Sequence, residues 1–483
     1  MAKDFIVAIE LGSSKITGMA GKKNPDGSIT ILAAASEDST SYIRKGVVYS
    51  IDKTTQGLSN IISKLKNSLQ ADITQVYVGI GGQSIHSVKN MVIKDLPMDA
   101  IVSQNMVNEL MDSNRNMTYP DYEIQDAITE EYKVDLQYQN DPVGIQASRL
   151  EGNFLNILWR RSFYRNLNKS FDNAGIAIAE TYLAPLVMAD NVLTEAEKRA
   201  GCVLVDLGAE TTTVSVYYRD KLRSIAVIPL GGDNITKDLE SLQMEACEAE
   251  RMKLKYSSAI TDVADIDPTA ILPIDSNRSV ESRRFIEVVE ARTLEIIENV
   301  KSFIPSEYID KLLGGIIITG GGSNMTNIEK AFREITGVEK IRIAKFVTLN
   351  INSKDSKPEL RHDGTMNTIL SLIARGDMNC AGNPFGNSLF DNQQFNAAFT
   401  TGTTNGSTTT QPNATTPHET EEERTKREEK ERIAKEEAER IKQEEETRKA
   451  KEEEERKKNS PIHRFFGSLK QFGRSLVEPE NNE

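Results

Sequence analysis

The sequence has few cysteines, and their spacing excludes the sites that cysteine usually builds. Cys202, Cys247 and Cys380 lie far apart, with no metal-ligand or redox spacing, which argues against a zinc site or a disulfide framework. Long apolar runs are also missing, since none approaches the roughly 18 residues of a membrane-spanning helix. The apolar stretch 5–9 is too short for a signal peptide. We therefore expect a protein of the reducing cytoplasm whose contact with a membrane is peripheral.

An excess of positive charge is absent as well. The formal net charge is −13, whereas a nucleic-acid partner requires a dominant basic face. The four histidines stand in unrelated contexts and form no Ser-His-Asp or Cys-His arrangement. We expect no nucleic-acid binding, and we interpret the histidines as structural or surface residues.

Two changes of composition divide the chain. Up to about residue 390, β-rich runs alternate with helix-period stretches and short turns, which predicts an α/β fold. Residues 391–418 are mostly Thr, Asn, Gly and Gln, a composition typical of a flexible linker. Residues 419–459 are almost all Glu, Lys or Arg, and Glu-to-basic pairs four residues apart favour a solvated single helix over a disordered segment, without excluding the latter.

The segment 460–478 has apolar residues spaced three and four apart. This spacing predicts an amphipathic helix, and Ser460-Pro461 is a suitable start for it. Its alternative is a helix packed on the globular body. The apolar face would enter a lipid interface while the basic residues meet anionic headgroups. The predicted membrane-binding residues are Ile462, Phe465, Phe466, Leu469, Phe472 and Leu476, with Arg464, Lys470 and Arg474.

A repeated unit is the strongest internal signal. Each copy consists of a β-run, an acidic residue, a glycine turn rich in hydroxyls, and two further β-runs. The runs are 5–9, 16–20 and 28–35 in the first copy, and 201–205, 213–218 and 222–230 in the second. One copy alone is a common hairpin. Two copies facing each other would clamp a nucleoside triphosphate between duplicated domains.

The chemistry of these turns favours phosphate. Glycine lets the backbone approach a phosphate, and successive N–H groups and hydroxyls donate to its oxygens. The acidic residues Glu10 and Asp206 are suited to hold Mg²⁺ through water. The predicted phosphate-binding residues are Gly12, Ser13, Ser14 and Lys15 in the first turn, and Asp206, Gly208, Thr211 and Thr212 in the second.

Two further elements fit a nucleoside. The predicted buried strand 315–319 runs into Gly320, Gly321, Gly322 and Ser323, where missing side chains would let a base or ribose lie against the backbone. Glu250 and Lys253 stand three apart on one predicted helix face, from which they would bond to ribose hydroxyls. The alternative reading of that pair is a surface ion pair.

The order of these motifs carries a family resemblance. IELGSSK, LVDLGAETTT, AERMK and ITGGGSNM resemble the phosphate-1, phosphate-2, ribose and adenosine motifs of the actin, sugar-kinase and heat-shock-chaperone ATPase superfamily. Within it the chain is most similar to FtsA, through VYVGIGG at 76–82, DPVGIQASRLEG at 141–152, LAPLVMADNVLTEAEKRAG at 183–201 and the turn 231–236. The resemblance adds Gly232 to the nucleotide-binding residues.

The resemblance implies a fold, a cofactor and partners. The fold would have two actin-like lobes, and the cofactor would be ATP with Mg²⁺. An FtsA protein would bind the C-terminal peptide of FtsZ, anionic membrane lipids, other divisome proteins and copies of itself in filaments, on the cytoplasmic face of the membrane at the septum. The implied subdomains are 1–83 with 163–197 (1A), 84–162 (the insert, 1C), 198–235 with 314–390 (2A), and 236–313 (2B).

One position departs from the family pattern, which usually has Asp where this chain has Glu10. The longer arm would loosen a water-mediated Mg²⁺ contact. The sequence names no residue that orients the attacking water, and Glu180 and Asp190, before the second motif, are no more than candidates. We therefore expect ATP binding with at most slow hydrolysis. Two alternatives remain open: a small-molecule kinase or chaperone-like ATPase, and a type IV pilus assembly protein of the PilM kind.

The FtsZ site is predicted near residues 283–304. Basic residues there surround an apolar helix with Phe285, Ile286 and Val289, which would suit an acidic, apolar peptide. A merely solvated helix face is the alternative. The predicted partner-binding residues are Arg283, Arg284, Arg292 and Lys301.

Overall fold

The computed structural model describes residues 4–97, 100–262, 264, 266–267, 269–353 and 359–381. All of them belong to the first of two units of the chain, Met1–Ala398. The predicted linker 391–418, the charged segment 419–459 and the amphipathic helix 460–478 lie outside the described residues and stay predictions. No helix in the described ranges is long and apolar enough to cross a membrane.

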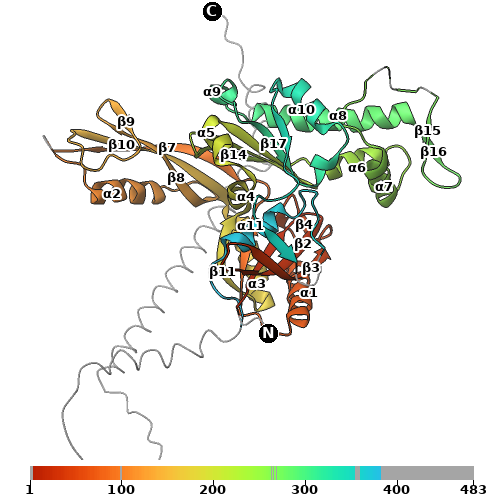
Figure 1. Ribbon diagram of the computed structural model, residues 1–483, viewed down its shortest axis with the longest axis horizontal. Coiled ribbons are helices and arrows are strands. Elements are labelled where there is room, and N and C mark those ends of the chain that lie inside the picture. The colour runs from red at the N-terminus through yellow and green to blue at the C-terminus, as the bar shows by residue number, and fades with distance from the viewer. Residues whose placement is uncertain are drawn as a thin grey trace, which may run out of the picture. The chain divides into compact units, whose positions relative to one another are not determined.

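The first lobe is built on a six-stranded sheet with the order β11-β6-β1-β2-β3-β19 (Figure 1). Strands β1, β2 and β3 form an antiparallel meander, and β6 and β11 extend it in parallel from β1. The strands are β1 (Ile6–Leu11), β2 (Lys15–Lys23), β3 (Ile29–Asp38), β6 (Gln75–Ile80), β11 (Ala177–Leu183) and β19 (Ile351–Ser353).

Helices cover both faces of this sheet. They are α1 (Ile51–Leu69), α3 (Arg161–Ala174), α4 (Ala184–Val192) and α11 (Asn367–Arg375). A Cβ atom on Gly18 would lie 2.4 Å from Ile61 of α1, and one on Gly21 would lie 2.8 Å from Ile373 of α11. Strand residues three apart point to opposite faces, so β2 uses two glycines to let a helix approach each side. The small hairpin β4 (Ile43–Arg44) and β5 (Val47–Val48) precedes α1.

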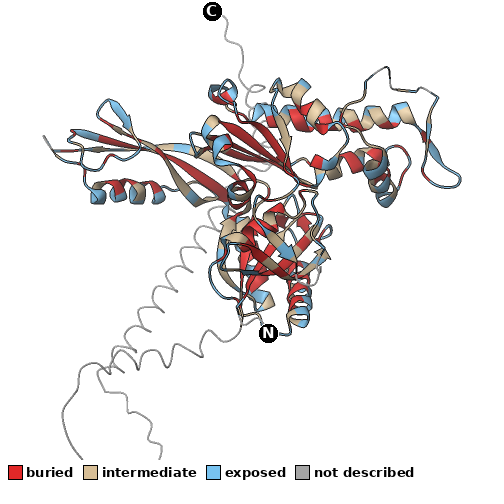
Figure 2. Ribbon diagram, in the orientation of Figure 1, coloured by how far each residue is buried: buried red, intermediate tan, exposed pale blue. Residues whose placement is uncertain are grey.

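The second lobe repeats the arrangement. Strands β12, β13 and β14 form an antiparallel meander, and β17 pairs with β12 in parallel, as β6 pairs with β1. The duplication predicted from the sequence is therefore confirmed, and Figure 2 shows the central strands of both sheets buried. The strands are β12 (Cys202–Leu207), β13 (Thr212–Tyr218), β14 (Lys221–Ile228), β17 (Gly315–Thr319) and β18 (Ile341–Ile343).

Helices of the second lobe enclose a core of their own. Ile235, Leu239, Met252, Phe285 and Val289 are buried together in it. The helices around this core are α6 (Gly232–Glu240), α7 (Ala246–Tyr256) and α8 (Ser282–Ser302), whereas α10 (Ile328–Thr336) packs on the core of the second sheet. The shorter elements are α5 (Glu195–Ala200), α9 (Ser306–Ile309), β15 (Ile271–Pro273), β16 (Ser279–Glu281) and the 3-10 turn η2 (Gly321–Asn324).

The inserted subdomain leaves the chain between β6 and α3 but joins the sheet of the second lobe. Its strands and helix are β7 (His86–Asp95), α2 (Gln104–Arg115), β8 (Tyr122–Val134), β9 (Gln137–Gln139) and β10 (Arg149–Arg160). They continue the second sheet in the order β14-β7-β10-β8-β9. Strands β14 and β7 share one ladder pair, Ala226 with His86. The N–H groups of Ile225 and Val227 extend this contact by donating to Ser87 Oγ and to the Ile85 carbonyl. Arg223 and Glu130, only 9% and 8% exposed, form an ion pair of 3.3 Å beside it.

We expect that removing one partner of the Arg223–Glu130 pair destabilises this junction. Arg223→Met leaves a buried carboxylate without its cation and should lower the unfolding free energy by about 3 kcal/mol. In the double variant Arg223→Met/Glu130→Leu the uncompensated charge is gone, and most of the loss should be recovered. Thermal unfolding of the three proteins measures this. Equal melting temperatures for Arg223→Met and the unsubstituted protein would show that the pair contributes nothing.

Candidate functional site

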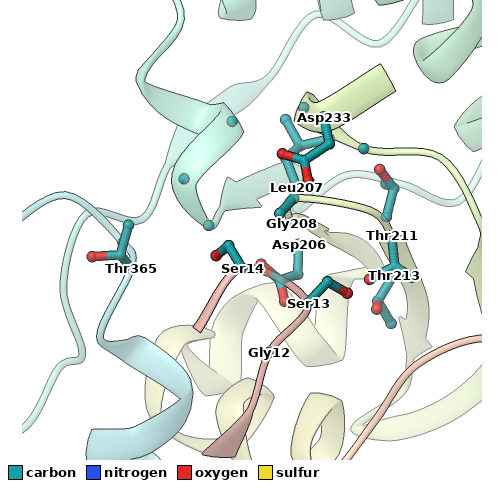
Figure 3. A pocket seen from close by; sticks show the side chains of 18 of the residues that line it. Gly12, Ser13, Ser14, Asp206, Leu207, Gly208, Thr211, Thr213, Asp233 and Thr365 are labelled. Atoms are coloured by element: carbon teal, nitrogen blue, oxygen red, sulfur yellow. The ribbon is translucent and has the colours of Figure 1, made fainter. Parts of the chain in front are cut away.

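A cavity of about 530 Å³ opens between the two lobes and is lined by residues from both (Figure 3). Of the sixteen residues predicted to hold nucleotide or metal, all but Ser323 line it. They are Glu10, Gly12, Ser13, Ser14, Lys15, Asp206, Gly208, Thr211, Thr212, Gly232, Glu250, Lys253, Gly320, Gly321 and Gly322. Segments more than 300 residues apart in the sequence thus meet around one space.

The two glycine turns have the same backbone geometry. The N–H of Gly12 donates to the carbonyl of Lys15 at 3.0 Å, and the N–H of Gly208 donates to the carbonyl of Thr211 at 2.9 Å. A Cβ atom would lie 2.7 Å from the Lys15 oxygen in the first turn and 2.8 Å from the Thr211 oxygen in the second. Each turn therefore requires glycine for the same steric reason, and Figure 3 shows both facing the cavity.

The second turn is fixed on the N-terminus of α6. The N–H of Gly232 donates to the carbonyl of Gly208 at 3.0 Å, and the N–H of Asp233 donates to that of Ala209 at 2.7 Å. The side chain of Asn234 accepts from the N–H of Gly231 at 2.9 Å and so caps the helix. The backbone of the turn is thereby set before any ligand arrives, which is the preorganisation that an anion site needs.

Glu10 and Asp206 face the cavity from the ends of β1 and β12. Burial raises the pKa of Glu10 to about 7, the charge of Asp206 adds to this rise, and Lys15 opposes it. Burial alone raises the pKa of Asp206 to about 6. Among the described residues no three His, Cys, Asp or Glu side chains group closely enough to hold a metal directly. The pair fits a divalent cation that also takes water and phosphate oxygens as ligands.

Glu250 and Lys253 belong to a network at the edge of the cavity. Lys253 Nζ lies 2.6 Å from the Glu250 carboxylate and donates to the carbonyl of Gly232 at 3.0 Å. It also donates to Thr236 Oγ1 at 2.8 Å, and that hydroxyl donates to Glu250 at 2.5 Å. The Lys253 side chain is only 10% exposed, so the pair is no ordinary surface ion pair.

The three glycines after β17 have different roles. A Cβ atom on Gly320, whose φ is +84°, would lie 2.3 Å from Asp206 Oδ1, and one on Gly322 would lie 2.8 Å from the Leu207 side chain. Both are therefore required by packing against β12. Only Gly321 has open space, with its nearest neighbour at 3.7 Å.

The prediction for Ser323 is wrong, because its side chain is buried and its hydroxyl donates to the Gly320 carbonyl instead of lining the cavity.

The sequence reasoning missed several lining residues, of which Ser257 and Thr368 are chemically the most specific. Ser257 is the C-cap of α7, and its hydroxyl is buried without a hydrogen-bond partner in the described part of the chain. Thr368 hydrogen-bonds to Glu10. The spacing of Ser257, four residues after Lys253, was a usable signal, since it places both on one helix face. Thr368 had none.

Neither candidate for orienting a water molecule lies in the cavity lining. Glu180 is exposed on β11 and accepts a hydrogen bond from the Tyr182 hydroxyl. Asp190 is exposed on α4 and pairs with Lys198 at 2.8 Å. These two expectations are wrong, because the strand and the helix direct both carboxylates elsewhere.

The helix predicted to bind the FtsZ peptide is α8, but two of its apolar residues do not lie on the surface. Phe285 and Val289 are fully buried in the core of the second lobe, so they are not available to a peptide. Arg284 is exposed. The other three basic residues have partners within the chain: Arg283 pairs with Glu287, Arg292 with Asp238 and Glu295, and Lys301 with the carbonyl of Ile335.

Two duplicated lobes around one cavity, with a subdomain inserted in the first, define an actin-like α/β protein. The solved PilM-PilN type IV pilus biogenesis complex shares this fold, with a TM-score of 0.53 at 14% identity over 77% of this chain and 98% of that chain.

Sequence comparison gives the family. The profile described as cell division protein FtsA matches residues 203–361, and that of the SHS2 domain inserted in FtsA matches residues 82–158. The chain is 32% identical to cell division protein FtsA of Porphyromonas gingivalis, over 71% of this chain and 74% of that protein. It is 29% identical to the Neisseria meningitidis protein, over 71% and 88%. The chain belongs to the FtsA family.

We expect the carboxyls of Glu10 and Asp206 to make stability depend on pH. Their folded-state pKa values lie above those of the unfolded chain, about 4, so the folded protein holds these protons more tightly. The resulting stabilisation is complete below pH about 4 and is lost as the pH rises through about 6 to 7. Glu10→Gln should therefore be more stable than the unsubstituted protein at pH 8, by about 1–3 kcal/mol.

Melting temperatures of the two proteins from pH 5 to 8, without divalent cations, measure this difference. The exposed Glu240→Gln serves as the control and should track the unsubstituted protein. A Glu10→Gln difference that does not change with pH would refute the assignment of a raised pKa.

Proposed function

We propose that this protein is an ATP-binding member of the cell-division machinery that links FtsZ filaments to the cytoplasmic membrane at the septum. The observation that carries the ATP assignment is the pair of glycine turns, closed by the same backbone hydrogen bond, on opposite walls of one cavity. A triphosphate has anionic oxygens to offer both turns at once, and preorganised N–H groups and the hydroxyls of Ser13, Ser14 and Thr211 would donate to them. The Thr212 hydroxyl already donates to the Leu230 carbonyl at 2.9 Å. Membership of a cell-division family supports the cellular role.

The rest of the cavity suits Mg²⁺ and a nucleoside. Glu10 and Asp206 would hold the cation through water, and the cation would neutralise phosphate charge. Glu250 would accept from the ribose hydroxyls while Lys253 holds it in place. Gly321 leaves room for the nucleoside, and the unpartnered hydroxyl of Ser257 is a donor or acceptor for the base.

We expect slow ATP hydrolysis from the positions and partners of the carboxylates in the cavity. Those lining the cavity, within the described residues, are Glu10, Asp206, Asp233 and Glu250. The first two serve the metal, and Glu250 is tied to Lys253 and Thr236. Asp233 stands at the start of α6, where its N–H holds the second turn. Asp233 is thus the one carboxylate of the four left for a general base, and no hydrogen bond within the described residues orients its side chain. Turnover should therefore fall well below the enzyme median of about 10 per second.

FtsZ and the membrane would occupy separate parts of the chain. Arg284 on α8, with its exposed charge, is the basic residue best placed to meet an acidic peptide. The amphipathic segment 460–478 would bind anionic lipid, each basic residue adding about 1 kcal/mol near the surface. Self-association would multiply such weak membrane contacts by raising the effective concentration. Partners beyond FtsZ would be other divisome proteins.

Ser257→Ala tests the nucleoside part of the site. It removes one buried hydroxyl and should weaken ATP binding about fivefold to tenfold, the loss of one hydrogen bond. The matched control is Ser241→Ala, which changes the same residue type at the C-cap of α6, away from the cavity. Isothermal titration measures both. Equal affinities for the two variants would place the base elsewhere.

Flotation with anionic liposomes tests the link itself. FtsZ should float only when this protein is added. Phe465→Glu/Phe472→Glu should abolish flotation of both proteins, whereas Phe465→Leu/Phe472→Leu keeps the apolar face and should preserve it. Arg284→Glu should float without FtsZ, and the control Arg165→Glu, at an exposed position of α3, should carry FtsZ normally. FtsZ recruitment that survives the double Glu variant would overturn the proposal.

A further inference from the structure

Glu210 is set apart from the rest of the second glycine turn. Every other residue of 206–212 lines the cavity, but Glu210 does not. A carboxylate pointing into the space between two phosphate-binding turns would repel a triphosphate. Its side chain is turned away from the cavity and is only 18% exposed, so it is engaged with protein.

The carboxylate of Glu210 reaches the other lobe. Its Oε2 accepts a hydrogen bond of 2.6 Å from the backbone N–H of Lys45, in the turn between β4 and β5. Its Oε1 lies 3.4 Å from Lys237 Nζ on α6. Lys237 is 61% exposed, so that ion pair contributes little. The charge-assisted bond to the Lys45 amide is the stronger contact.

The receiving hairpin is itself held in place. Lys45 and Gly46 both have positive φ, 50° and 72°, as a tight two-residue hairpin turn requires. The N–H of Gly46 donates to Ser13 Oγ of the first glycine turn at 2.8 Å, and the N–H of Gln83 donates to the Lys45 carbonyl at 2.8 Å. A Cβ atom on Gly46 would lie 2.5 Å from Gly82. The hairpin tip is therefore seated against the first turn and has little freedom to follow Glu210.

We propose that Glu210 is a positioning residue that latches the second glycine turn onto the β4–β5 hairpin and thereby slows the release of a bound nucleoside triphosphate. The inference rests on the proposed function, because it concerns regulation of the same site. The bond joins the two lobes, and separating them by about 1 Å breaks it. A ligand held by both turns can leave only when the turns move apart. The hydrogen bond between Glu210 and Lys45 must therefore break before the ligand leaves.

Stopped-flow release of a fluorescent ATP analogue with Mg²⁺, chased by excess ATP, tests the latch in the full chain. Glu210→Ala should release the analogue about tenfold faster, the effect of losing one charge-assisted hydrogen bond. Glu210→Gln should show a smaller increase, since its amide oxygen still accepts from Lys45. Lys237→Met, the matched control, removes only the exposed ion pair and should release at the unsubstituted rate.

Hydrogen exchange supplies a readout that needs no nucleotide. The Lys45 amide should exchange faster in Glu210→Ala than in the unsubstituted protein. Equal release rates in Glu210→Ala and the unsubstituted protein, or equal exchange at Lys45, would overturn the latch while leaving ATP binding intact. Failure of the unsubstituted protein to bind the analogue would instead overturn the proposed function, and the latch with it.

Discussion

The structure depends on one backbone contact made twice, the hydrogen bond that closes each glycine turn over the carbonyl three residues later. In both lobes the space for a Cβ atom is occupied by that carbonyl, at 2.7 Å for Gly12 and 2.8 Å for Gly208. The neighbouring elements are arranged around the turns: the N-terminus of α6 bonds to the second, and Ser39 and the β4–β5 hairpin bond to the first. The turns are thereby rigid, and relative motion of the lobes becomes the remaining freedom of the site.

The carboxyls of Glu10 and Asp206 in the cavity lower the stability of the folded protein. Two carboxyls held in a poorly solvated space, with raised pKa values, oppose folding at neutral pH unless a cation or proton offsets them. Such groups are typical of functional sites and not of stabilising ones. A divalent cation bound with a triphosphate would remove this cost, so ligand binding and stability should rise together. In the Arg223–Glu130 pair, by contrast, the protein itself supplies the opposite charge for each buried group.

Much of the fold and site could be predicted because it is local in the sequence. The strand 315–319 was predicted with the bounds that β17 has, since a short apolar run flanked by glycine leaves few alternatives. Side-chain direction was harder. The sequence showed that α8 has apolar residues but not that Phe285 and Val289 face a core, and it could not show that Ser323 turns inward. The inserted subdomain joins β14 through contacts between residues distant in sequence, such as Ala226 with His86 and Arg223 with Glu130, for which no local pattern exists.

On this proposal, one nucleoside triphosphate is held between the two turns together with a divalent cation. Isothermal titration of the full chain with ATP, with and without Mg²⁺, tests it most directly. We expect one site per chain, tighter binding with Mg²⁺, and an affinity that increases from pH 6 to pH 8 as Glu10 and Asp206 lose their protons. Absence of binding under all of these conditions, or binding that ignores both Mg²⁺ and pH, would contradict it.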